Sequence, residues 1–228
     1  EVDPNHLTTF TLAGIGKREI DYIREHCTDV DFISIQMYGD IVNLSTRIAD
    51  AGWEGPYMVT EWGATGHWEV ARTEWDVAIE PTSQEKANSL IERYRVAIAA
   101  DPVHCMGSYV FLWGQKQERT PTWYGMFLEN GNETETVDAM HYLWNGTWPE
   151  NRCPTLDSLR LNGMSAYDNI RLKTGKTFNG EVFARDYEND PLVYRWEILP
   201  ESTDLGWGGD FERRPETFLS TEGDEAME

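Results

Sequence analysis

The sequence predicts an α/β fold with a parallel sheet, followed by a smaller all-β segment. Short apolar runs alternate four times with helical patterns over residues 1–148. This alternation is typical of βα units, whose strands lie parallel. From residue 149 onward only strand patterns follow one another. We therefore expect two domains, 1–148 and 149–228, with the Pro-containing segment 149–154 as the linker.

Four apolar runs are expected to form the parallel strands, and a helical pattern follows each of them. Thr82 and Glu85, behind Pro81, have the spacing of a capping box that starts the third helix. Asp101-Pro102 stops this helix. The expected strands cover 7–12, 31–38, 56–63 and 104–113, and the helical patterns run from Lys17 to Cys27, Ile41 to Gly52, Thr82 to Ile98 and Val137 to Gly146.

Two long loops indicate where a functional site would lie. Residues 64–81 follow the third strand and residues 114–132 follow the fourth. Loops longer than about 12–15 residues in a compact domain are usually functional. Both loops leave the carboxyl ends of parallel strands, where (β/α)8 TIM barrels and doubly wound sheets place their sites. Four βα units amount to half of such a barrel.

The segment after the linker is expected to form an incomplete β-sandwich. Residues 192–198 alternate apolar and polar side chains, which is typical of a half-buried antiparallel strand. Three or four strands rarely close two sheets. Asp186, Glu188 and Asp190 stand beside a turn and predict either a Ca²⁺ site or, more in keeping with so few ligands, an acidic turn without metal. The expected strands cover 156–164, 169–172 and 181–199.

The composition excludes several classes of partner. Forty Asp plus Glu against nineteen Lys plus Arg give a net charge of −21, which repels nucleic acid and anionic membranes. No apolar run approaches the roughly 20 residues that span a bilayer. Three scattered cysteines, Cys27, Cys105 and Cys153, predict neither a disulfide framework nor a zinc site, and we expect free, buried thiols, with no metal or cofactor.

The ten tryptophans and the first residues give two further expectations. Indole rings fill cores, but they also offer flat apolar surfaces on which sugar rings stack. The chain begins with Glu1, without Met, and its first stretch is polar. We therefore expect no signal peptide within it and a piece of a longer protein.

Glu61 is the sharpest candidate for chemistry. It ends an apolar strand, directly before Trp62 and Gly63, at the expected mouth of the sheet. A carboxylate in such a place is costly to desolvate unless a donor binds it. Tyr38 ends the preceding strand at an equivalent height, and its hydroxyl can be that donor. The pair predicts a nucleophilic or electrostatic carboxylate; an ion pair between Glu61 and a local Arg is the equally weighted alternative.

The strand sequences resemble the second half of a retaining glycoside-hydrolase barrel, most closely the catalytic domain of family 2 and its relatives in clan A. The resemblance covers about residues 1–148. It rests on the segments Pro56-Tyr57-Met58-Val59-Thr60-Glu61-Trp62-Gly63, Ile33-Ser34-Ile35-Gln36-Met37-Tyr38, Gly107-Ser108-Tyr109-Val110-Phe111-Leu112-Trp113 and Glu1-Val2-Asp3-Pro4-Asn5-His6. It implies the C-terminal half of a TIM barrel, strands five to eight.

The resemblance also implies roles for single residues. In such enzymes one carboxylate attacks the anomeric carbon and another protonates the leaving oxygen. Glu61 would be the nucleophile, Tyr38 its hydrogen-bond partner and Trp113 a platform for the sugar. The Asn-Glu motif of the acid/base should precede the first strand, and nothing in this chain matches it. Either the acid/base lies upstream in a longer protein, in which case the chain alone would be inactive, or the activity is lost.

Other side chains near these strands are weaker candidates. Gln36 lies on the same side as Tyr38 by period-two counting and could reach a sugar hydroxyl, while His67 and Trp68 could line a subsite or pack locally. Glu118 is a remote candidate for a substitute acid on its loop. Trp123 and Tyr124 are expected to fill space between loops rather than stack on sugar.

Together these features predict a retaining glycosidase fragment that acts on a β-linked oligo- or polysaccharide outside the cell or in the periplasm. A non-catalytic carbohydrate-binding or adhesion protein is the alternative. The segment 190–197 resembles immunoglobulin-like modules of the cadherin and PKD kind, which implies a spacer or adhesive appendage. Half a barrel would leave two unpaired sheet edges, so we also expect poor solubility or self-association.

Overall fold

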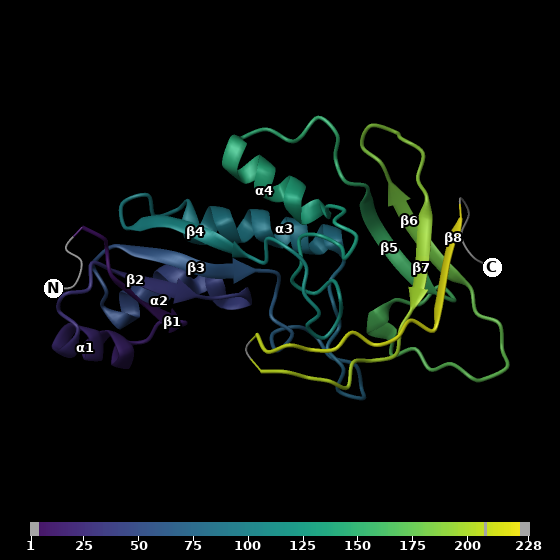
Figure 1. Ribbon diagram of the computed structural model, residues 1–228, viewed down its shortest axis with the longest axis horizontal. Coiled ribbons are helices and arrows are strands. Elements are labelled where there is room, and N and C mark those ends of the chain that lie inside the picture. The colour runs from purple at the N-terminus through teal and green to yellow at the C-terminus, as the bar shows by residue number, and fades with distance from the viewer. Residues whose placement is uncertain (1–4, 208, 224–228) are drawn as a thin grey trace. The chain divides into compact units, whose positions relative to one another are not determined.

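The computed structural model describes residues 5–207 and 209–223 (Figure 1). Its larger sheet has four strands, all parallel, in the order β1-β2-β3-β4. The prediction of a parallel α/β sheet is therefore confirmed. The strands are β1 (Thr9–Ala13), β2 (Phe32–Gln36), β3 (Tyr57–Gly63) and β4 (Cys105–Phe111).

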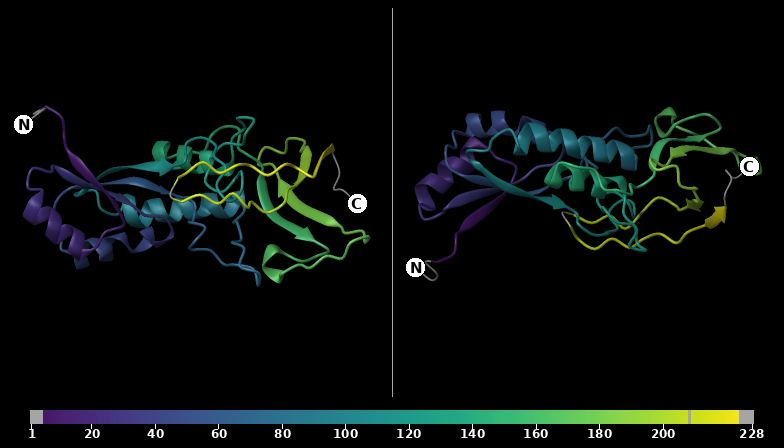
Figure 2. Two further views of the ribbon diagram at one scale, coloured as in Figure 1. Left: turned by 60° about the horizontal axis from the view of Figure 1, so that its bottom comes forward. Right: turned by 90° about the horizontal axis from the view of Figure 1, so that it is seen from above.

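The order of the strands follows the order of the sequence, without a switch point. Helices that connect such strands fall on one side of the sheet, as in a barrel, whereas a doubly wound sheet reverses its strand order and places helices on both faces. The two views of Figure 2 show α1 (Lys17–His26) and α2 (Leu44–Ala51) on the same side of the sheet. The arrangement is that of a singly wound sheet of four strands.

The first two helices begin and end close to the predicted positions. In α1, Ile20 and Ile23 are buried, as their spacing predicts. The short 3-10 helix η1 (Gly39–Asn43) precedes α2, so the single pattern from Ile41 onward forms two elements. Gly52 ends α2 in the left-handed conformation at φ 73°, which glycine adopts without strain.

The third helix combines two kinds of turn. The α-helix α3 (Ser83–Arg93) continues into the π-helical turn η2 (Tyr94–Ile98). The predicted capping box is present, because Thr82 N donates to Glu85 Oε2 at 2.7 Å and Glu85 N donates to Thr82 Oγ1 at 3.2 Å. Among the described residues no helix is long and apolar enough to cross a membrane.

After the fourth helix, α4 (Glu135–Asn145), the regular elements of the described residues are strands and one 3-10 turn, η3 (Ala166–Asp168). β5 (Thr155–Leu161) pairs antiparallel with β6 (Gly180–Arg185), and β7 (Tyr194–Ile198) with β8 (Leu219–Gly223). The predicted strand at 169–172 is wrong, and β8 was not predicted. Two two-stranded sheets give an all-β segment, while the immunoglobulin-like sandwich stays a prediction.

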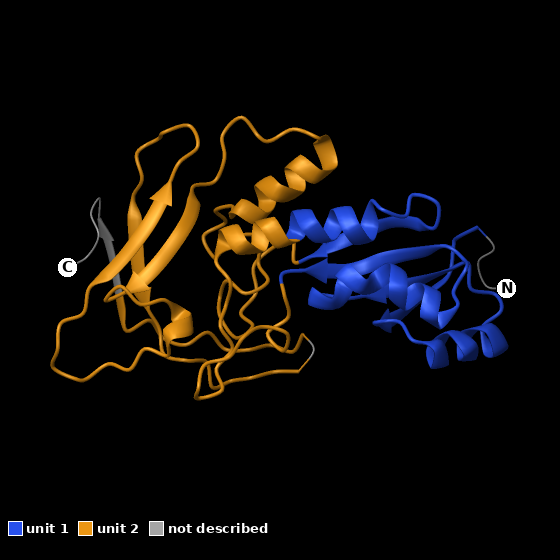
Figure 3. Ribbon diagram, turned by 180° about the vertical axis from the view of Figure 1, so that it is seen from behind, with its two compact units in different colours: residues 1–64, 90–111 blue, residues 65–89, 112–228 orange. Residues whose placement is uncertain are grey.

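The chain divides into two compact units (Figure 3). Unit 1 comprises residues 1–64 and 90–111 and contains the parallel sheet with its buried core side chains Ile33, Ile35, Val59 and Trp62. Unit 2 comprises residues 65–89 and 112–228 and contains both long loops, α4 and the β-strands β5–β8. These bounds differ from the predicted division at 148/149, which stays a prediction for the domains.

The two long loops hold each other in place within unit 2. Trp123 and Tyr124 are buried there, and the Trp123 indole N–H donates to the carbonyl of Thr65 at 3.0 Å. Lys86 donates to Glu80, and Glu80 also accepts a hydrogen bond from Thr122 Oγ1 at 2.9 Å. The expectation that Trp123 and Tyr124 fill space between loops is confirmed.

Candidate functional site

A β-bulge in β3 determines the position of Glu61 in unit 1. Ile35 lies opposite Val59, but Gln36 lies opposite Glu61, so Thr60 is an extra residue in β3. The Thr60 hydroxyl is buried and has no hydrogen-bond partner among the described residues. Bulges of this kind re-aim a side chain and are common beside active sites. Here the bulge brings Glu61 next to Gln36 at the carboxyl ends of β2 and β3.

Two side chains donate hydrogen bonds to the Glu61 carboxylate, one to each oxygen. The Tyr38 hydroxyl donates to Oε1 at 2.6 Å, and Gln36 Nε2 donates to Oε2 at 3.0 Å. All three residues are half-buried. The predicted contact between Tyr38 and Glu61 is thus present, whereas Gln36, predicted to reach a sugar hydroxyl, contacts the carboxylate itself. The catalytic and substrate-binding roles of these residues stay predictions.

The backbone around the carboxylate is tightly held. Met37 N donates to the Glu61 carbonyl at 3.0 Å, which ties β2 to β3 at this point. A Cβ at Gly63 would lie 2.0 Å from the carbonyl oxygen of Phe111, so only glycine fits where β3 passes β4. Arg93, buried on α3, donates from Nη1 to the Gly63 carbonyl at 2.7 Å. The carboxylate therefore rests on a strand end with little freedom to move.

Phe111 is a neighbour of the site that the sequence analysis did not single out. Its ring lies edge-on to the Tyr38 ring, with centroids 6.2 Å apart. It ends β4 and stands two residues before Trp113, the residue predicted as the sugar platform. Aromatic rings in this geometry restrict each other's rotation. Its position at the end of the strand β4 is the signal that could have identified it.

Trp113 lies in unit 2, just after β4. Its ring contacts Phe127 edge-on at 5.2 Å and Trp144 at 5.8 Å between centroids. The side chain is 54% exposed. An indole that is fixed by neighbours and open on one side can stack on a sugar ring, so the geometry is compatible with the predicted platform.

His67 and Trp68 are also in unit 2, and they contact each other. Their ring centroids are 4.9 Å apart and the rings are nearly perpendicular. His67 N donates to the Tyr124 hydroxyl at 3.2 Å. Burial, followed by the positive charge of Arg119, lowers the pKa of His67. Trp68 is exposed, so of the two alternatives, local packing describes His67 better than Trp68.

Glu118 is buried and already engaged. Its Oε2 accepts a hydrogen bond from Lys116 Nζ at 2.6 Å, and its Oε1 lies 3.9 Å from His67 Nε2. A general acid needs access to the leaving group. Glu118 is buried and its carboxylate is held by Lys116, which argues against Glu118 as the substitute acid.

The acidic turn near Asp190 has an internal explanation. Asp186 Oδ1 accepts hydrogen bonds from the backbone N–H of Glu188 at 2.8 Å and of Asp190 at 2.9 Å. This is the arrangement by which Asp side chains stabilise turns. Of the two alternatives for these acids, the turn without metal is the one that these hydrogen bonds support.

Comparisons with known proteins give distant structural likenesses. Neither a protein-family profile nor a curated protein matches the chain. A GH2 beta-galacturonidase from Eisenbergiella tayi, solved with bound galacturonate, is 16% identical over 52% of this chain and 24% of its own, with a TM-score of 0.39. A GH39 beta-xylosidase from Caulobacter crescentus is 15% identical over 69% of this chain and 36% of its own, with a TM-score of 0.44. The chain thus spans well under two thirds of the length of either protein.

Proposed function

We propose that the chain is part of a retaining glycoside hydrolase in which Glu61 is the nucleophile. The observation that carries the proposal is the Glu61 carboxylate, which accepts one hydrogen bond per oxygen at the carboxyl end of a parallel strand. Two donors fix the plane of the carboxylate, and each oxygen keeps a further lone pair. A carboxylate with a fixed orientation can attack an anomeric carbon without first reorganising.

The second carboxylate of the mechanism would come from outside this chain. Retaining enzymes place the two carboxyl groups about 5–5.5 Å apart, on either side of the scissile bond. In this proposal the parallel sheet is the C-terminal half of a barrel and the acid/base stands on a strand of the other half. The substrate would be a neutral or weakly charged β-linked glycan, since a net charge of −21 disfavours polyanions. The place of action would be the periplasm or the outside of the cell.

The role of Glu61 as nucleophile can be tested in a chain that lacks the acid/base carboxylate. Dinitrophenyl 2-deoxy-2-fluoroglycosides carry a leaving group that departs without a general acid, and the fluorine slows hydrolysis of the glycosyl-enzyme. Incubation with a panel of such β-glycosides should add one fluorosugar to the chain, and peptide mapping should place the ester on Glu61. Glu61→Gln should abolish the label, because an amide cannot form this ester, and fold normally.

Glu69→Gln is the matched control, since Glu69 is an exposed carboxylate close by in sequence, and it should label like the unmodified chain. Labelling of another residue, or equal labelling of Glu61→Gln, would remove Glu61 from the mechanism. The exposed, fixed ring of Trp113 favours a second function, carbohydrate binding without cleavage. Saturable binding of a glycan by a chain that takes up no label from any glycoside would support that alternative.

A further inference from the structure

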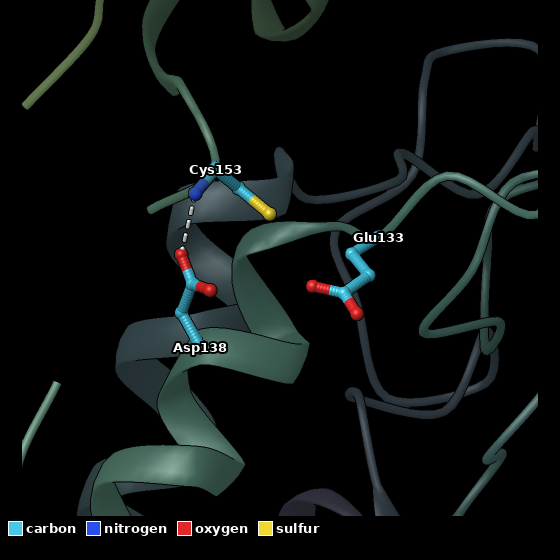
Figure 4. Close-up of side chains that lie close together, drawn as sticks. All are labelled: Glu133, Asp138 and Cys153. Atoms are coloured by element: carbon cyan, nitrogen blue, oxygen red, sulfur yellow. Dashed lines mark hydrogen bonds between the residues drawn. The ribbon is translucent and has the colours of Figure 1, made fainter. Parts of the chain in front are cut away.

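Three ligand atoms of types that bind metals meet in unit 2, in residues that the proposed function does not use. They belong to Glu133, Asp138 and Cys153, and each lies within 4.8 Å of the others (Figure 4). Glu133 precedes α4, Asp138 lies in its first turns and Cys153 follows the linker. In the sequence these residues are up to twenty positions apart, which is why the cysteine count alone predicts no metal site.

Asp138 is the buried member of this cluster, with only 2% of its surface exposed. Its Oδ2 accepts a hydrogen bond from the backbone N–H of Cys153 at 2.7 Å, and its other oxygen lies on the side of the thiol and Glu133 (Figure 4). Among the described residues no ion pair joins Asp138 to a cationic side chain. A buried carboxylate without a paired cation is costly, and a bound metal ion would remove that cost.

Arg152 is a source of positive charge for Asp138, but two aromatic rings hold its side chain. Its guanidinium carbon lies 3.8 Å from the centroid of the Trp148 ring and 3.5 Å from that of Tyr187. These two cation–π contacts hold the guanidinium against the rings. Burial raises the pKa of Asp138, and the positive charge of Arg152 opposes this rise only in part.

Thr155 supplies an observation that is independent of the acidic side chains. It is fully buried, and its Oγ1 has no hydrogen-bond partner among the described residues. It begins β5, and Pro154 before it favours an extended conformation at Cys153. In an extended chain residues two apart project to the same side. The unpartnered hydroxyl is thus expected on the same side of the chain as the Cys153 side chain, two residues away.

We propose that Glu133, Asp138 and Cys153 bind a zinc ion, with Thr155 or water near the fourth position. A thiolate together with carboxylates suits Zn²⁺, whereas Mg²⁺ and Ca²⁺ take oxygen ligands alone. Bonds of about 2.0–2.3 Å put tetrahedral ligand atoms about 3.3–3.8 Å apart, so the cluster must close by roughly 1 Å. Glu133 is exposed and can make this movement. The site joins the start of α4 to the start of β5.

Titration of the reduced, full chain with Co²⁺, a spectroscopic substitute for zinc, tests the site. One ion should bind per chain with a thiolate-to-cobalt absorption band, and Zn²⁺ should abolish the band by displacing the cobalt. Cys153→Ser should lose the band, while Cys27→Ser and Cys105→Ser, at two half-buried free thiols, should keep it. Absence of the band in the unmodified chain, or its persistence in Cys153→Ser, would overturn the proposal.

Competition with a chromophoric chelator gives the affinity for zinc. Glu133→Gln changes an exposed side chain and should weaken binding at least tenfold without disturbing the fold, and Asp138→Asn should weaken it further. Glu150→Gln, at an exposed acid of the linker, should leave the affinity unchanged. Equal affinities in all these variants would show that zinc binds to the acidic surface in general. That result would also overturn the proposal, and it is independent of any glycosidase activity.

Discussion

Glu212 shows how one side chain can hold an irregular segment in place. Only 2% of its surface is exposed. Its Oε2 accepts a hydrogen bond from Arg119 N at 2.6 Å and its Oε1 accepts one from Gly206 N at 2.9 Å, with the Arg119 guanidinium 3.3 Å away. The carboxylate thus joins the loop after β4 to the segment before β8, both in unit 2.

Glu212→Gln should loosen this junction. An amide carries no charge and offers one acceptor oxygen, so at least one of the two N–H groups loses its partner. Hydrogen bonds to charged groups contribute about 1.5–3 kcal/mol to stability. A difference of about 1.4 kcal/mol changes an equilibrium constant, here that of local opening, tenfold. Amide hydrogen exchange at Arg119 and Gly206 should therefore become about 10–100 times faster. Glu216→Gln, at an exposed neighbour, should leave both rates unchanged; equal effects of the two substitutions would contradict the role of Glu212.

At the scale of single residues, the sequence could indicate where functional side chains stand but not which residues they contact. Glu61 and Tyr38 are recognisable because each ends an apolar run, and parallel strands bring their carboxyl ends together. The contact of Gln36 with Glu61 depends on the extra residue at Thr60, and period-two counting assumes that no bulge interrupts the strand. Glu212 lies in a stretch without periodicity, so its burial has no signal in the local sequence.

The sequence predicts helix ends that depend on particular residue types at fixed spacing. It does not predict strands that form by pairing with a distant segment of the chain. The end of α2 at Gly52 and the capping box of α3 follow from residue types at fixed spacing. β8 lacks such a signal, because its pairing with β7 is made across about twenty intervening residues. The segment 169–172 reads as a strand by composition, but it pairs with no strand among the described residues.

The capping box of α3 makes a prediction at the scale of the element. Thr82→Ala removes the acceptor for Glu85 N and should lower the free energy of unfolding by about 1 kcal/mol. Thr82→Ser keeps the hydroxyl and should restore most of this stability. Urea unfolding followed by far-ultraviolet circular dichroism measures the difference. Equal losses in both variants would show that the methyl group of Thr82, rather than its hydroxyl, matters to the helix.

For the molecule as a whole, the two edge strands of the parallel sheet in unit 1 determine whether the chain associates with another chain. Within the part of the chain that the structure describes, β1 and β4 each pair with one strand only. Both carry exposed apolar side chains, among them Phe10 at 46% and Tyr109 at 65%. An edge strand with unpaired backbone groups and apolar side chains is a template for association with another chain. A sheet that belongs to half of a barrel would have these edges for a physical reason, since the other half would cover them.

The full chain should therefore associate with itself in a concentration-dependent way. Lysine on an edge strand opposes such pairing by its charge, so the double variant Phe10→Lys, Tyr109→Lys should shift the equilibrium toward monomer. Tyr22→Lys, at an exposed aromatic residue of α1, introduces the same charge away from the sheet edges and should have little effect. Sedimentation velocity at a series of concentrations measures the association. A chain that is monomeric throughout and melts cooperatively would show that its edges need no partner, and the half-barrel interpretation would then lose its main physical consequence.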